Sequence, residues 1–117
     1  MTKRERAVLA LVRRYRRAIG LTNWDIGVRF ADDPAGAACN ADDEYLRATL
    51  TFDLTRIPAG EEAEFVRHEL LHAVTWELLR VAEHLAQDDR VALESVRAAS
   101  ERCTTLLERM PVWRALA

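Results

Sequence analysis

No glycine or proline interrupts the stretch from Glu61 to about Gln87, and this stretch constrains the fold more than any other part of the 117-residue chain. Its apolar residues recur every three or four positions, which is the spacing of one face of a helix: Val66, Leu70, Val74, Leu78, Val81 and Leu85. The pattern predicts one long helix over residues 60–87. Two carboxylates, Glu61 and Glu62, fall at its start and favour the positive end of a helix.

This helix carries the sequence His68-Glu69-Leu70-Leu71-His72. Residues four apart stack one turn above the other, so the two imidazoles project side by side and can bind one metal ion. The pattern H-E-x-x-H indicates a Zn²⁺ site at which Glu69 is the general base for a metal-activated water. The alternative interpretation is a solvated helix face. The remaining histidine, His84, is about 18 Å further along the helix and too far away to be a ligand.

A catalytic zinc site needs a third protein ligand, and a helix predicted over residues 88–110 supplies two candidates. The short connection before this helix makes it an antiparallel neighbour of the long helix. With the turn near Gln87, Glu101 is level with His72. Glu94 would reach that level only if the chain turned near Glu83, inside an uninterrupted helical pattern, so it ranks second. The expected metal ligands are therefore His68, His72 and Glu101.

A helix over residues 1–20 and a small sheet over residues 21–57 precede the long helix. Thr2 followed by Glu5 predicts a capping box at the helix start. Alternating apolar residues predict strands over Trp24–Phe30 and Leu46–Leu54, and a short strand over Ala37–Asn40. The fold class is α+β, with the order helix, three strands, helix, helix.

The chain length fits one domain over residues 1–117, in which residues 111–117 form a tail. No apolar stretch approaches the roughly 20 residues that cross a bilayer, and no secretory signal is recognisable. Cys39 and Cys103 lie too far apart to form a ligand pair, so we expect free thiols. These features predict a soluble, cytoplasmic protein that has no membrane partner.

The first helix has a basic face. A run of this kind can bind phosphate groups, but it is more often only solvated. The net charge of −2 gives no general attraction to nucleic acid, so we do not expect nucleic acid as a partner. The residues of this basic face are Lys3, Arg4, Arg6, Arg13, Arg14, Arg16 and Arg17.

Together these segments resemble small zincin-like metallopeptidases, including those of phages and prophages, and the minimal gluzincins. The segments that carry the resemblance are Trp24-x-Ile26-x-Val28-x-Phe30, Ala48-x-Leu50-x-Phe52-Asp53, His68-Glu69-Leu70-Leu71-His72 and Glu101-Arg102-Cys103-Thr104-Thr105. The resemblance implies a zincin-like scaffold, zinc held by His68, His72 and Glu101, and Glu69 as general base and acid. It also implies a peptide or protein substrate. A C-terminal segment around Trp113 that keeps the enzyme latent is one hypothesis for the tail, and docking of the tail onto the hydrophobic core is the alternative.

Further expectations concern the substrate. Tyr45 and Arg97 are the candidates for a side chain that stabilises the oxyanion. The segment Thr49–Asp53 can pair with an extended substrate if it forms an edge strand. Two other functions stay open. One is a non-catalytic binding module that uses the basic first helix. The other is a metal hydrolase acting on RNA, which ranks last because the third histidine of that motif is missing.

Overall fold

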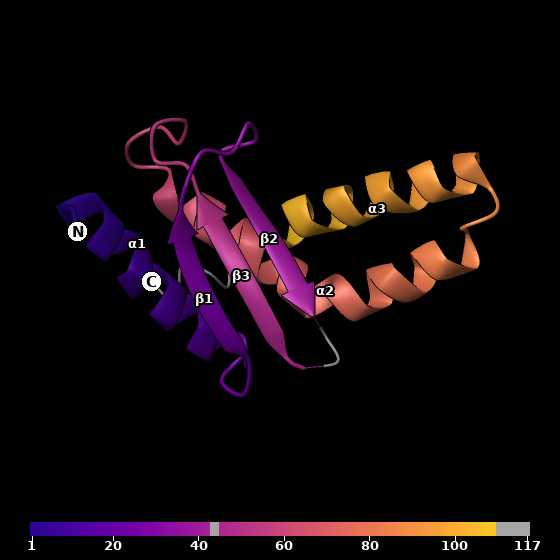
Figure 1. Ribbon diagram of the computed structural model, residues 1–117, viewed down its shortest axis with the longest axis horizontal. Coiled ribbons are helices and arrows are strands. Elements are labelled where there is room, and N and C mark those ends of the chain that lie inside the picture. The colour runs from indigo at the N-terminus through magenta and orange to yellow at the C-terminus, as the bar shows by residue number, and fades with distance from the viewer. Residues whose placement is uncertain (43–44, 110–117) are drawn as a thin grey trace.

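The computed structural model describes residues 1–42 and 45–109. Over these residues the chain is a small α+β protein with a three-stranded mixed sheet (Figure 1). The elements follow the predicted order, and each boundary lies within two residues of the expected one. They are α1 (Lys3–Ala18), β1 (Asp25–Phe30), β2 (Ala37–Asp42), β3 (Arg47–Phe52), α2 (Glu62–Leu85) and α3 (Arg90–Glu108).

The sheet has the strand order β1-β3-β2, so the last strand lies in the middle. β3 pairs in parallel with β1 and antiparallel with β2, and the arrows in Figure 1 show both directions. The condition under which Thr49–Asp53 could pair with a substrate is therefore not met, because β3 has a neighbour on each side. Among the described strands, β1 and β2 are the edges.

One face of the sheet carries the core, and α1 and α2 cover it. Along β3 the buried residues Ala48, Leu50 and Phe52 alternate with the more exposed Arg47, Thr49 and Thr51, as the period of two predicts. The helices add further buried apolar side chains, which are Val8, Val12 and Tyr15 from α1 and Val66, Leu70, Leu71 and Ala73 from α2.

Asp53 follows β3 and is buried, although the alternation placed it on the outer face of the sheet. The strand ends one residue earlier, at Phe52, and the chain turns. The Asp53 carboxylate accepts hydrogen bonds from the backbone N–H groups of Asp33 (3.0 Å) and Thr55 (3.1 Å) and from Nε of Arg56 (3.0 Å). The Thr55 hydroxyl also donates to this carboxylate, at 2.5 Å, and this bond is the main cause that holds the pKa of Asp53 below its usual value, followed by the bond from Asp33 N–H. Together the bonds connect the β1–β2 loop to the turn after β3.

The start of α1 has the predicted capping box, in which Glu5 N–H donates to the Thr2 hydroxyl and Thr2 N–H donates to the Glu5 carboxylate. Three arginines of the basic face bind within the chain, of which Arg6 donates to the Met1 carbonyl at 2.9 Å. Arg4 pairs with Glu62 at 2.6 Å and donates to backbone carbonyls after β3. Arg16 donates to the carbonyls of Leu21, Thr22 and Trp24. Part of the basic face therefore stabilises the fold.

α2 and α3 form an antiparallel pair, which we call the α2–α3 hairpin. Asp89 caps α3 by accepting a hydrogen bond from Ala92 N–H. The far half of the hairpin extends away from the sheet (Figure 1), and the molecule measures 46 × 29 × 28 Å. The apolar row of α2 is consequently buried only near the sheet, at Val66 and Leu70.

Among the described residues, no helix is both long and apolar enough to cross a membrane. The thiols of Cys39 and Cys103 are free, as expected, and Cys103 is exposed. The expectations about Met110, Trp113 and the tail lie outside the described residues.

Candidate metal centre

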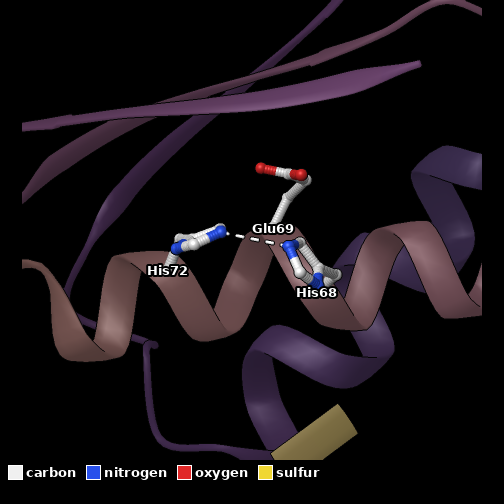
Figure 2. A group of neighbouring side chains, drawn as sticks. All are labelled: His68, Glu69 and His72. Atoms are coloured by element: carbon white, nitrogen blue, oxygen red, sulfur yellow. Dashed lines mark hydrogen bonds between the residues drawn. The ribbon is translucent and has the colours of Figure 1, made fainter. Parts of the chain in front are cut away.

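His68 and His72 lie one turn apart on α2, and a nitrogen of each ring points toward the other ring (Figure 2). The two Nε2 atoms are 3.1 Å apart, and the ring centroids are 4.7 Å apart. Both side chains are partly buried at the junction between α2, α3 and the sheet. Helical spacing thus brings two imidazole nitrogens to one point, as the sequence motif predicts.

Glu101 approaches the same point from α3. Its carboxylate oxygens lie 3.3 Å from Nε2 of His68 and 3.1 Å from Nε2 of His72. The other candidate, Glu94, pairs with Arg90 one turn away on the exposed surface of α3. The structure therefore brings Glu101, and not Glu94, to the two histidines.

The distances between these donor atoms fit a tetrahedral zinc ion. With Zn–N and Zn–O bonds of 2.0–2.1 Å, the ligand atoms of a tetrahedral site are about 3.3 Å apart. The two Nε2 atoms are 3.1 Å apart, and each lies 3.1 to 3.3 Å from a different oxygen of the Glu101 carboxylate, which is close to that value. In the absence of a cation, nitrogen lone pairs and a carboxylate face one another, which is unfavourable unless a proton lies between them. A divalent cation satisfies all three groups.

Glu108 is a fourth group of the site, and the sequence interpretation missed it. Its carboxylate lies 3.0 Å from Nδ1 of His68. A protonated Nδ1 donates to this carboxylate and leaves Nε2 with a free lone pair toward Glu101, which is the tautomer that binds a metal. Glu101 and Glu108 are seven residues apart, so they lie on one helix face, and that spacing was the available signal.

The apolar spacing of α3 does not decide which face of this helix turns toward α2. Cys103 and Leu106 follow that spacing, yet both are exposed. Thr104, which lies between the two glutamates on the helix face, is fully buried and donates to the carbonyl of Ser100. Near the sheet, α3 therefore turns a polar face toward α2, because that face contacts the histidines.

Glu69 projects from the same helix toward the sheet (Figure 2). Its donor atom lies within 4.8 Å of those of His68 and His72. Burial is the main cause that raises the pKa of Glu69 to about 8, and the nearby carboxylates of Glu101, Asp33 and Glu108 raise it further. Glu69 is thus a carboxyl group that exchanges its proton near neutral pH.

Two other groups have shifted pKa values. Burial is the largest cause that lowers the pKa of His72, and His68 contributes in the same direction, while Glu101 opposes them. A neutral imidazole is the form that binds metal. Burial, with a smaller effect from Glu69, raises the pKa of the Cys39 thiol to about 12. Without a cation beside it, the Cys39 thiol therefore stays protonated at neutral pH.

A cavity of about 680 Å³ opens beside these groups. Its walls come from α2, α3, the β1–β2 loop and β2, with Phe65, Trp76 and Ala38 among the lining residues. The two expected oxyanion donors lie elsewhere. Arg97 pairs with Glu83 at 2.8 Å on the hairpin, and Tyr45 is exposed beside Arg47.

At this site two imidazoles and the Glu101 carboxylate surround one point. The buried carboxyl group of Glu69 lies beside them and can exchange a proton, and the cavity opens next to all of these groups. Such a set can hold a divalent cation and transfer a proton. Comparisons of the chain with models of known protein families, with curated proteins and with solved structures found no match.

Proposed function

We propose that this chain is a zinc-dependent metallopeptidase built on a zincin-like scaffold. His68, His72 and Glu101 hold the ion, and Glu69 is the general base and acid. One observation carries the proposal. The two Nε2 atoms and the Glu101 carboxylate converge at separations of 3.1 to 3.3 Å, with the buried carboxyl of Glu69 beside them.

When bound, the zinc ion lowers the pKa of a coordinated water toward 7 and polarises the substrate carbonyl. Glu69 accepts a proton from the water and later donates it to the leaving amine. The positive charge of the ion favours the ionised carboxylate, so it brings the pKa of Glu69 down from about 8 into the range of a base. Glu108 fixes the tautomer and orientation of the His68 ring.

An extended peptide is the substrate that the cavity suits best. β2 borders the cavity through Ala37, Ala38 and Cys39, and among the described strands it pairs only with β3. Its other edge has backbone groups with which an extended chain can form strand hydrogen bonds. The small alanine side chains leave space for side chains of the peptide. β2 thus takes the role that was expected of Thr49–Asp53.

Zinc analysis and a peptidase assay test the proposal together. The purified protein is expected to bind one equivalent of Zn²⁺ and to cleave a denatured protein substrate. Glu69→Gln is expected to keep the zinc and lose cleavage, because the amide cannot accept the proton. His72→Ala is expected to lose both. Glu94→Gln is a matched control on α3 and should change neither.

Several outcomes would contradict the proposal. If the wild-type protein binds no zinc, the metal centre is wrong. If zinc binds and cleavage is equal in Glu69→Gln, the activity does not belong to this site. Salt-sensitive binding of nucleic acid that survives Glu69→Gln, without any cleavage, would favour the binding module instead.

A further inference from the structure

The far half of α2 carries an apolar row that is exposed, formed by Val74, Leu78, Val81 and Leu85. These four side chains are between 48% and 81% exposed. They follow one another at intervals of four, three and four residues, which is the a/d spacing of a coiled-coil seam. Large apolar side chains in one contiguous row on a helix mark a contact surface.

The row continues the buried face of the same helix. Nearer the sheet, Val66 and Leu70 lie on this face and are fully buried in the core. Toward its C-terminal end, α2 extends past the sheet together with α3 (Figure 1). No element in residues 1–42 and 45–109 covers the row there, because its members remain exposed.

The row is complementary to a second copy of itself. A two-fold axis that crosses α2 between Leu79 and Arg80 pairs residue 78 with residue 81 and residue 74 with residue 85. Every such pair joins a leucine to a valine, so large side chains meet smaller ones across the whole seam. No charged residue occupies any of the four positions. A two-fold contact of this kind requires the same patch on both subunits, which this row supplies.

We propose that two copies of the chain associate through their α2–α3 hairpins, with α2 antiparallel to α2 of the partner subunit. Leu78 packs against Val81 of the partner subunit, and Val74 packs against Leu85 of the partner subunit. The two hairpins together form an antiparallel four-helix arrangement.

The groove between α2 and α3 supports this contact. A cavity of about 290 Å³ lies beside the row, with Leu78 at its border. Small side chains of Thr75 and Ala82 line it from α2, and Val96 and Ala99 line it from α3. Small residues beside a seam allow helices to approach closely, and the groove is a hole into which apolar side chains of a partner fit.

The size of the surface sets the strength of the dimer. Residues 74–85 span about 17 Å along α2. A two-helix face of that length is smaller than the roughly 800 Å² per partner of a standard interface. The dimer is therefore reversible, and we expect association in the micromolar concentration range. His72 is about 160° around the helix from Val74, so the contact leaves the metal site open.

Sedimentation velocity of the full chain from low to high micromolar concentration tests the proposal. The wild-type chain is expected to shift from monomer to dimer. Leu78→Glu and Val81→Lys are each expected to stay monomeric, because each places a charge opposite an apolar side chain. An equimolar mixture of the two variants is expected to form a mixed dimer, because the glutamate then faces the lysine of the partner subunit. Val91→Lys is the control, because Val91 is an exposed valine outside the row.

Circular dichroism of each variant separates loss of contact from loss of fold, because the replaced side chains are exposed and helix content should not change. A wild-type chain that is monomeric at every concentration overturns the proposal. So does a mixture that fails to associate although each variant is folded. If only a chain truncated after Arg109 dimerises, residues 110–117 cover the row, and the proposal is also wrong. Zinc content and peptidase activity are independent readouts, so their failure leaves this test unaffected.

Discussion

The carboxylate of Glu108 lies 3.0 Å from Nδ1 of His68, while Nε2 of the same ring lies 3.3 Å from the carboxylate of Glu101. Each nitrogen of the His68 ring therefore faces its own carboxylate from α3. Rotation of the His68 ring about its Cβ–Cγ bond would break these contacts. The hairpin geometry thus fixes both the position and the tautomer of one proposed metal ligand.

Removal of the Glu108 carboxylate is expected to weaken zinc binding without abolishing it. Loss of a partner that orients a metal-bound histidine typically costs 10- to 100-fold in metal affinity. We expect a loss in this range for Glu108→Ala and a smaller one for Glu108→Gln, whose amide oxygen still accepts from Nδ1–H. Competition with a chromogenic chelator measures the affinity.

The matched control is Glu94→Ala, which removes an exposed carboxylate from the same helix. Its zinc affinity should equal that of the wild-type protein. Equal affinities for Glu108→Ala and the wild-type protein would show that the contact with His68 does not orient a ligand.

Glu69 is expected to make the stability of the metal-free protein depend on pH. Its pKa is about 8 in the folded chain and about 4.5 in the unfolded chain. Between these values the unfolded chain releases the proton that the folded chain retains, so the free energy of unfolding falls as the pH rises from 4.5 to 8. A shift of this size corresponds to roughly 3 to 5 kcal/mol.

Glu69→Gln removes this titration while it keeps the shape of the side chain. We expect the variant to exceed the metal-free wild-type protein in stability at pH 8 and to match it much more closely at pH 4.5. Urea denaturation in the presence of a chelator, at both pH values, provides the comparison. A stability difference that does not change with pH would mean that Glu69 titrates normally.

Much of the fold could be predicted from local sequence patterns. The capping box at Thr2, the alternation in β3 and the break at Gln87 depend on neighbouring residues, so they were readable without tertiary information. The level of Glu101 opposite His72 followed from the antiparallel geometry of two helices. These features need only helix rise, strand period and turn position.

The missed features depend on contacts between distant segments. The insertion of β3 between β1 and β2 is a long-range choice that alternation does not encode, so the sequence left open which strand forms an edge. The rotation of α3 follows the contacts of Glu101 and Glu108 with the histidines rather than its apolar residues. For α2, the apolar period identified a face but not how far the sheet extends beneath it, so the exposure of Leu78 was not predictable.

Arg4 is expected to be the basic residue of α1 that matters most for stability. Its guanidinium pairs with Glu62 and also donates to the carbonyls of Leu54 and Ile57, so it connects α1 to the chain that leads into α2. Arg4→Ala leaves the Glu62 carboxylate and both carbonyls without this donor. We expect a loss of about 2 to 3 kcal/mol in thermal or urea denaturation.

Arg13→Ala is the control for Arg4, because Arg13 lies on the same helix and is exposed. A surface substitution of this type usually changes stability by no more than about 0.5 kcal/mol. Equal effects of the two substitutions would mean that the Arg4 contacts contribute no more than a solvated charge.

Gly36 is expected to tolerate a side chain less well than Gly60, although both have positive φ angles of 87° and 92°. Alanine at either position costs about 1 to 2 kcal/mol because of the left-handed backbone. At Gly36 the added Cβ would also lie 3.0 Å from Cε1 of Phe65, whereas Gly60 has no atom within 4 Å of that position.

The contact at Gly36 concerns the proposed site as well as stability. Gly36 directly precedes β2, its carbonyl accepts from Asp53 N–H at 2.8 Å, and Phe65 lines the cavity. Relief of the clash in Gly36→Ala must move Phe65 or the start of β2. We therefore expect Gly36→Ala to lose more stability than Gly60→Ala in urea denaturation, and to raise KM for a peptide substrate while zinc content stays at one equivalent. Equal stability and equal KM in the two variants would show that β2 and Phe65 do not jointly shape the substrate cavity.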